Sequence, residues 1–324
     1  MELSVVVPVF GCRDCLDALH ARLHRALALL THDYEVIFVD DGSVDGSWDV
    51  LLDLARKDPA TRLVRLSRNF GQHAAITAGL AESTGDWVVV TDCDLEDPPE
   101  EIPRLWSKAH EGYDFVLARR RRRRQSLFRR VAGALYRKLA NLLAGTDVDP
   151  HLTNLSVVSR PVVSEFLRLQ DRERQYILIL LWLGFEHAVV DVDQDERFAG
   201  GSSYSFGELL RVAVDGIFFQ TTRLLRWIVY AGFIVAAIGV ALAAVVIYTY
   251  AHSSPPQGWA SLSVLVLILS GFIIASTGVT GLYVGKIFNQ VKGRPLYVVA
   301  ARVKGGAEEP VISEIADQSE PSLR

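Results

Sequence analysis

The sequence predicts an α/β protein with a doubly wound, mostly parallel sheet, and three observations lead to this class. Short apolar runs alternate with helical patterns from residue 3 to residue 118. Most of the runs end on proline, aspartate or glycine, residues that close strands and start turns. Residues 1–225 carry mixed charges and are long enough for one large domain, whereas two later stretches are almost uncharged.

The predicted elements follow one another with short connections. In parallel sheets, ligands bind at the carboxyl ends of the strands, so Pro8, Asp40-Asp41 and Asp92-Asp94 are expected to meet in one crevice. No GxGxxG motif follows the first strand and no GxxxxGK[ST] motif is present, which argues against a dinucleotide fold and a P-loop kinase. Strands are expected at 3–9, 34–39, 62–66, 87–91, 113–118, 155–159 and 188–192, and helices at 14–30, 45–56, 72–82, 100–112, 161–169 and 174–183.

An acidic stretch, VVVTDCDLEDPP at residues 88–99, closes the fourth predicted strand. If the extended backbone persists past Thr91, side chains alternate and Asp92, Asp94 and Glu96 point to one side. Three carboxylates on one face repel each other unless a cation lies among them. Mg²⁺ and Mn²⁺ take such oxygens and are commonly completed by substrate phosphates. The alternative is an acidic turn that only ends a buried strand.

Two stretches, 228–250 and 262–284, are each about 23 residues long and almost uncharged, which is enough for two transmembrane helices within residues 226–286. The loop between them, His252–Ser261, has no lysine or arginine, while both outer flanks are basic. By the positive-inside rule, both termini and the 1–225 domain are expected in the cytoplasm. We expect residues 287–324 to form a cytosolic tail that is disordered after 305.

Six consecutive arginines, Arg119–Arg124, precede Arg129 and Arg130. Apolar residues at three- and four-residue spacing then predict a basic amphipathic helix over 127–143, suited to a membrane interface, and a second interfacial helix is expected at 205–225. Beside a membrane, this basic stretch favours anionic lipid over nucleic acid as its partner.

The cysteines are Cys12, Cys15 and Cys93. The CxxC spacing of the first two is typical of redox or zinc sites, but no second pair of ligands accompanies it. We expect free thiols, because the cytoplasm is a reducing compartment.

Together these stretches resemble the membrane-bound family 2 glycosyltransferases that load sugars onto polyprenyl phosphates, such as dolichol-phosphate mannose synthase and undecaprenyl-phosphate glucosyltransferases. The resemblance rests on VVVPVF near the start, VDDGSVDGS at 39–47, LSRNFGQHAA at 66–75, TDCDLEDPPE at 91–100 and RFAGGSSY at 197–204. With the two apolar stretches it covers nearly the whole chain. It implies a glycosyltransferase-A-like fold in a bacterial plasma membrane, acting in the cell envelope.

The resemblance also implies roles for individual residues. A nucleotide sugar, with UDP favoured over GDP, would bind at the strand ends, and Asp94 and Glu96 would hold Mg²⁺ or Mn²⁺ on its diphosphate. Catalytic roles are expected for Asp94, Arg120 and Arg197. The acceptor phosphate and the membrane would contact Arg119, Arg120, Arg129, Arg130 and Arg197, and the nucleotide sugar would contact Pro8, Phe10, Val39, Asp41, Asp92, Cys93 and Asp94.

The acceptor implied by the resemblance determines the expected mechanism. A phosphate monoester has a second pKa of about 6, so it is mostly dianionic at neutral pH and can attack without a strong protein base. Magnesium and arginine would stabilise the departing nucleoside diphosphate. A single displacement then inverts the anomeric centre. A homo-oligomer is compatible with the sequence.

Five positions depart from the family pattern. Relatives commonly have Asn-Glu at Gly11-Cys12, Asp and Arg at Asn154 and Ser156, and Lys at Ser203. The replacements at Asn154, Ser156 and Ser203 remove one acid and two cations, so the donor sugar is left open. Two alternatives also stay open: a processive polysaccharide synthase, although Leu224 stands where a QxxRW signature needs tryptophan, and a non-catalytic membrane scaffold of the same fold.

Overall fold

The computed structural model describes residues 1–120, 149, 151–169, 171, 174–193 and 259–309, and isolated positions between 230 and 248. The chain divides into two compact units. One unit comprises residues 1–124, 148–202 and 294–324, and the other comprises residues 125–147 and 203–293. The first unit contains the sheet and all the predicted site residues that the structure describes, and we call it the sheet unit.

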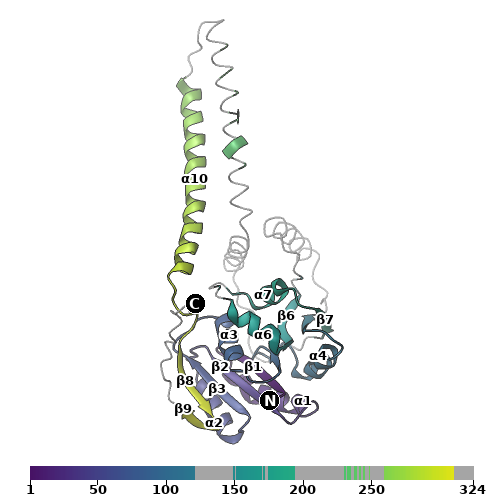
Figure 1. Cartoon of the computed structure of the whole chain (residues 1–324). Helices are drawn as coiled ribbons and strands as arrows, with labels where there is room; N and C mark the ends of the chain where they lie inside the picture. The colour runs from purple at the N-terminus through teal and green to yellow at the C-terminus, as the bar shows by residue number, and fades with distance from the viewer. Residues whose placement is uncertain are drawn as a thin grey trace, which may run out of the picture. The chain divides into compact units, whose positions relative to one another are not determined.

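In the described part of the chain, nine strands form one sheet in the order β7-β5-β6-β4-β1-β2-β3-β8-β9 (Figure 1). The central strands β4, β1, β2 and β3 are parallel, whereas β6 lies antiparallel between β4 and β5. This mixed, mostly parallel sheet confirms the predicted α/β class. The strands are β1 (Leu3–Val9), β2 (Tyr34–Asp40), β3 (Thr61–Leu66), β4 (Trp87–Val90), β5 (Phe115–Arg120), β6 (Leu152–Ser159), β7 (His187–Val192), β8 (Val299–Lys304) and β9 (Ala307–Glu309).

Helices cover both faces of the sheet, because alternate residues of each central strand face opposite apolar clusters. Val5 and Val7 pack in one cluster with residues of α1, α2 and α4, whereas Val6 packs in the other with residues of α3, α6 and α7. The predicted helices are confirmed, with a 3-10 turn (Arg13–Cys15) opening the first of them. They are α1 (Leu16–Leu27), α2 (Ser47–Lys57), α3 (Gln72–Glu82), α4 (Ile102–Ala109, after a 3-10 turn at Pro99–Glu101), α6 (Arg160–Arg168) and α7 (Tyr176–Leu183).

Helix α3 lies unusually close to the sheet at Gly79. A side chain at this position would overlap a methyl group of Val6 and come within 3.1 Å of a methyl group of Val39. Glycine is therefore required by the approach of the helix to β1 and β2, although it is a poor helix former.

The end of the chain differs from the sequence prediction. Strand β8 pairs antiparallel with β3, and β9 pairs with β8, so residues 299–309 belong to the sheet and the tail does not become disordered at 305. The reason lies in a short alternation in which Val303 is buried and Ala300 and Lys304 are exposed. Arg302 also pairs with Glu82 of α3 at 2.8 Å.

In the other unit, α10 (Trp259–Val291) contains 33 residues and includes the whole of the expected span 262–284. Most of the other expected span, 228–250, lies outside the described residues. A search of the described residues finds no helix with the length and apolar character needed to cross a membrane.

A disulfide joins Cys12 to Cys93, while Cys15 is free and buried. The prediction of three free thiols is therefore wrong. The two cysteines are 81 residues apart in sequence, but they follow the adjacent parallel strands β1 and β4 and so meet beyond the same edge of the sheet.

The packing at Gly79 gives a test of the fold. Gly79→Ala should lower the free energy of unfolding by about 1–3 kcal/mol, because the added methyl overpacks the contact with Val6. Ala81→Gly, at an exposed position of the same helix, should cost at most about 1 kcal/mol through helix propensity alone. Denaturant unfolding measures both, and a Gly79→Ala protein more stable than wild type would contradict the close approach.

The disulfide can be tested by peptide mapping without reductant, which should recover the linked Cys12 and Cys93 peptides. Reduction should lower stability by about 2–4 kcal/mol, because the bond closes a long loop in the unfolded chain. Cys12→Ser should start at the lower stability and not respond to reductant. Recovery of both cysteines as free thiols would contradict the pairing.

Candidate functional site

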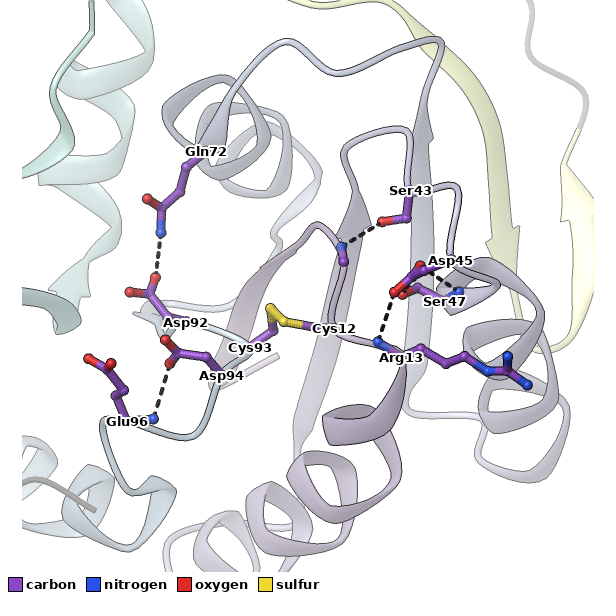
Figure 2. The surroundings of a disulfide bond; sticks show 11 residues. Cys12, Arg13, Ser43, Asp45, Ser47, Gln72, Asp92, Cys93, Asp94 and Glu96 are labelled. Carbon is purple, nitrogen blue, oxygen red and sulfur yellow. Dashed lines mark hydrogen bonds between the residues drawn. A yellow bond between two sulfur atoms is a disulfide. The ribbon is translucent and has the colours of Figure 1, made fainter. Parts of the chain in front are cut away.

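The candidate site lies beyond the carboxyl ends of β1, β2 and β4, where the topology brings together loops that are distant in sequence (Figure 2). The register of β1 against β2 pairs Pro8 with Val39 and Val9 with Asp40. The acidic loop after β4 lies beside them, because β4 pairs with β1. The expected convergence of the strand ends is therefore present.

The acidic loop is not extended, contrary to the assumption made from sequence. Strand β4 ends at Val90, and Leu95 has a φ of 61°, a left-handed value that is uncommon for a residue with a side chain. The backbone N–H of Glu96 donates to Asp94 Oδ1 at 3.0 Å, so the loop folds back on itself. Figure 2 nevertheless shows the side chains of Asp92, Asp94 and Glu96 on the same side of the loop.

Asp92 is held by two amide side chains. Gln72 Nε2 donates to Asp92 Oδ1 at 2.8 Å, and Asn154 Nδ2 donates to the same oxygen at 3.1 Å. Burial raises the pKa of Asp92 to about 6, and the negative charges of Asp94 and Asp97 act in the same direction. Neither Gln72 nor Asn154 had a predicted role. Gln72 stands in the motif at 66–75, and Asn154 was noted only as a departure from the family.

Asp94 lines a cavity of about 460 Å³ together with the loop after β1. The Cys12–Cys93 disulfide fixes this loop against the acidic loop (Figure 2). Asp45 accepts a hydrogen bond from the backbone N–H of Arg13 at 3.2 Å, which fixes its other side. The residues lining the cavity are Gly11, Cys12, Arg13, Asp14, Cys15, Asp45 and Asp94.

Arg120 at the end of β5 pairs with two carboxylates of the acidic loop. Its Nη1 lies 3.0 Å from Glu96 Oε2, and its Nε lies 3.2 Å from Asp97 Oδ1. The predicted site residue Arg120 is therefore beside the carboxylates. Arg119 points elsewhere, since its Nε lies 2.6 Å from Asp191 Oδ1 of β7.

Asp41 is buried and holds the loop before α3. It accepts hydrogen bonds from the backbone N–H groups of Phe70, at 2.7 Å, and Gly71, at 2.8 Å. Burial raises its pKa, and these two bonds oppose that shift. Gly42 permits the approach of the two loops: its φ is +71°, and a Cβ there would lie 2.7 Å from the carbonyl carbon of Arg68.

The remaining predicted nucleotide contacts differ in accessibility. Phe10 is 54% exposed beside the site, whereas the side chain of Val39 is buried against Ala75 and Ala78 of α3. Pro8 is buried within β1. Cys93 is occupied by the disulfide.

Several predictions lie outside the described residues. These are Arg129, Arg130, Arg197, Ser203 and the helices expected at 127–143 and 205–225. Ser156, a departure from the family, is described: its hydroxyl is buried 2.9 Å from the hydroxyl of Tyr176, so it contributes to packing below the site.

The carboxylates of the acidic loop suit a hard divalent cation in chemistry but do not enclose one by themselves. Among the described residues, the one group of three His, Cys, Asp or Glu side chains with ligand atoms within 4.8 Å of one another lies elsewhere, at His20, His24 and Asp58. A cation at the acidic loop would need further oxygen ligands, and phosphate groups commonly supply them.

Comparison with known proteins places this geometry in a family. Residues 4–162 match the family described as Glycosyl transferase family 2. The bactoprenol glucosyl transferase of Shigella phage SfX is 34% identical over 93% of this chain and 100% of its own length. The undecaprenyl-phosphate 4-deoxy-4-formamido-L-arabinose transferase of Yersinia enterocolitica is 34% identical over 95% of each chain.

One further relative and one solved structure are also similar to this chain. The uncharacterized glycosyltransferase YkcC of Bacillus subtilis is 33% identical over 92% of this chain and 93% of its own. A structure of glucosyl-3-phosphoglycerate synthase from Mycobacterium tuberculosis, in complex with Mn²⁺, UDP and phosphoglyceric acid, has a TM-score of 0.49 and 22% identity, over 67% of this chain and 76% of that chain. On the strength of the full-length sequence relatives, the chain belongs to glycosyltransferase family 2 and is a glycosyltransferase.

Proposed function

We propose that this protein transfers one sugar from a nucleotide sugar to a polyprenyl phosphate at the cytoplasmic face of a membrane, with Mg²⁺ or Mn²⁺. The observation that carries the proposal is the group of carboxylates beyond β4, with Arg120 beside it, in a chain that aligns over nearly its whole length with relatives named for bactoprenol and undecaprenyl phosphate.

The metal would be held by Asp94 and Glu96, whose oxygens are the ligands that hard divalent cations prefer. When bound, it supplies positive charge to the departing diphosphate. Because the carboxylates do not enclose an ion alone, the diphosphate would complete the coordination. Metal and donor should therefore bind together, each weakly without the other.

The donor would occupy the cavity beside Asp94 and the strand ends of β1 and β2. Phe10 offers an exposed ring for stacking against the base, and UDP remains favoured over GDP. The guanidinium of Arg120 already lies at the carboxylates, so it can offset negative charge as the nucleoside diphosphate leaves.

No protein base is needed for the acceptor. A phosphate monoester is mostly dianionic at neutral pH, because its second pKa is about 6. Asn154, where relatives commonly have aspartate, donates to Asp92 and cannot remove a proton. Its role is to hold Asp92, and transfer by direct attack of the phosphate inverts the sugar's anomeric centre.

The apolar stretches at 228–250 and 262–284 would hold the enzyme at its lipid. Helix α10 has no charged residue from Trp259 to Gly285. The chain also leaves the sheet unit after residue 202 and returns to its sheet at β8. A chain that returns to the same side must cross the membrane an even number of times, which supports a pair of crossings with both termini in the cytoplasm.

Substitution of Asp94 tests the proposed activity. Asp94→Ala should lower transfer at least about 100-fold, because it removes a ligand from the metal and charge control from the leaving group. The assay supplies purified protein with undecaprenyl phosphate, Mg²⁺ or Mn²⁺ and a panel of radiolabelled UDP- and GDP-sugars, and measures label extracted with the lipid. Chelation with EDTA should have the same effect on the wild type.

The matched control is Asp53→Asn, which changes an exposed carboxylate of α2 and should leave transfer unchanged. Full-rate transfer by Asp94→Ala would overturn the metal role. Products with many sugars per lipid would indicate a polysaccharide synthase, and retention of anomeric configuration would exclude single displacement.

The raised pKa of Asp92 predicts that the free energy of unfolding depends on pH. Its folded pKa is raised to about 6 from 3.8, so the stability it contributes is full below pH 3.8 and is lost as pH rises through 6. Asp92→Asn, measured by thermal unfolding in EDTA, should therefore be more stable than wild type by about 1–2 kcal/mol at pH 7.5 and equal to it near pH 4.

The same substitution should lower transfer, so stability and activity move in opposite directions. An Asp92→Asn protein that is less stable than wild type at pH 7.5 would show that Asp92 is held in its ionised form by its partners and would contradict the raised pKa.

A further inference from the structure

A second group of ligand-type side chains lies away from the acidic loop. His20 and His24 are one helical turn apart on α1, and their ring centroids are 4.2 Å apart. Asp58, the residue after α2, approaches both: its Oδ2 lies 3.1 Å from Nε2 of His20 and 2.9 Å from Nε2 of His24. One ligand atom from each of the three residues thus lies within 4.8 Å of the other two.

This group lies toward the opposite edge of the sheet from the candidate active site. Asp58 precedes β3, and the neighbouring Tyr34 begins β2, so both mark amino ends of strands. The acidic loop and Asp41 follow the carboxyl ends. The seven residues of β2 separate the two edges by about 20 Å.

Neighbouring hydroxyl groups and a backbone N–H hold His24 and Asp58 in place. Nδ1 of His24 lies 2.7 Å from the hydroxyl of Tyr34, and Thr61 Oγ1 donates to Asp58 Oδ2 at 2.6 Å. The backbone N–H of Ala60 donates to Asp58 Oδ1 at 3.0 Å. Histidine ligands of metals typically use their second nitrogen in this way, which fixes the ring and the tautomer.

Nε2 of His24 is the informative atom. It is buried and has no hydrogen-bond partner, although it lies 2.9 Å from a carboxylate oxygen. With the proton on Nδ1, directed to Tyr34, the lone pair on Nε2 faces the negative carboxylate, and a cation between them removes that repulsion. Burial, followed by the charge of His20, lowers the pKa of His24, and Asp58 opposes that shift.

The alternative is a closed cluster of ion pairs and hydrogen bonds that ties α1 to the start of β3. It accounts for His20, whose Nε2 also lies 3.1 Å from Thr61 Oγ1. In it, Nε2 of His24 contacts Asp58 Oδ2 at 2.9 Å without the geometry of a hydrogen bond. Four ligands around zinc, with bonds of about 2.0–2.1 Å, are separated by about 3.3–3.4 Å, so the present 2.9 and 3.1 Å distances need only small shifts outward.

We propose that His20, His24 and Asp58 form a second metal site that binds Zn²⁺ or a similar borderline transition metal, with water as the fourth ligand. Two imidazoles and one carboxylate select this class, whereas the all-oxygen set of the acidic loop selects Mg²⁺ or Mn²⁺. The metal would join α1 to the corner between α2 and β3, so its role is to stabilise the fold.

The test uses the full-length protein in detergent, stripped with EDTA and then kept in excess Mg²⁺ to occupy the acidic loop. Zn²⁺ is titrated against a chromophoric chelator, and thermal unfolding is followed in parallel. Wild type should bind one Zn²⁺ and melt at a higher temperature with it. The variant His20→Gln/His24→Gln should lose at least about 100-fold in affinity and show no shift in melting temperature.

Two variants serve as controls. His32→Gln changes an exposed histidine just beyond α1, and Asp94→Ala changes the acidic loop; both should still bind one Zn²⁺. Loss of binding in Asp94→Ala would place the zinc at the acidic loop and overturn the proposal. Wild-type binding that persists in the double histidine variant would also overturn it.

A second readout does not depend on the folding of any variant. Wild type loaded with Co²⁺ should show the strong visible ligand-field absorption of a four-coordinate site, and Zn²⁺ should displace it. Absence of both this band and zinc binding would overturn the proposal. Sugar transfer does not enter these measurements, so failure of the proposed transferase activity and failure of this site are distinguishable.

Discussion

The repulsion among carboxylates beyond β4 is the constraint on which the rest of the site depends. Asp92, Asp94, Glu96 and Asp97 lie within six residues, and all four are at least partly covered by protein. Such a group persists only where donors and cations compensate it. The compensation comes from three other parts of the chain: Gln72 at the start of α3, Asn154 in β6 and Arg120 at the end of β5. The order of the strands is what brings these parts to one place.

Much of this could be predicted from the sequence, because buried strands and their flanking turns leave a clear pattern. The runs at Leu3–Val9 and Tyr34–Asp40 are each followed directly by a residue of the candidate site, Phe10 and Asp41, and parallel pairing brings the ends of the two strands together. The role of Arg120 is predicted because its position matches an arginine of the family. The carboxylates were found because three of them follow a strand.

Other features depend on contacts that local patterns do not encode. The antiparallel insertion of β6 sets Asn154 against Asp92, and only the sheet order reveals it. The left-handed backbone at Leu95 ends the expected alternation, since nothing about leucine predicts that conformation. The disulfide joins Cys12 to a cysteine 81 residues later. Strand β8 was missed because its few apolar residues adjoin an acidic tail.

The pairing of β8 with β3 has a consequence for how the protein is made. The sheet unit is discontinuous along the chain: β8 and β9, at one side of the sheet, come from residues 299–309, after the whole of the second unit has been synthesised. Until then, β3 presents an unpaired edge, which is a surface prone to pairing with other chains. The ribosome therefore synthesises the sheet in two separate parts, and the sheet is complete only after the second unit has been synthesised.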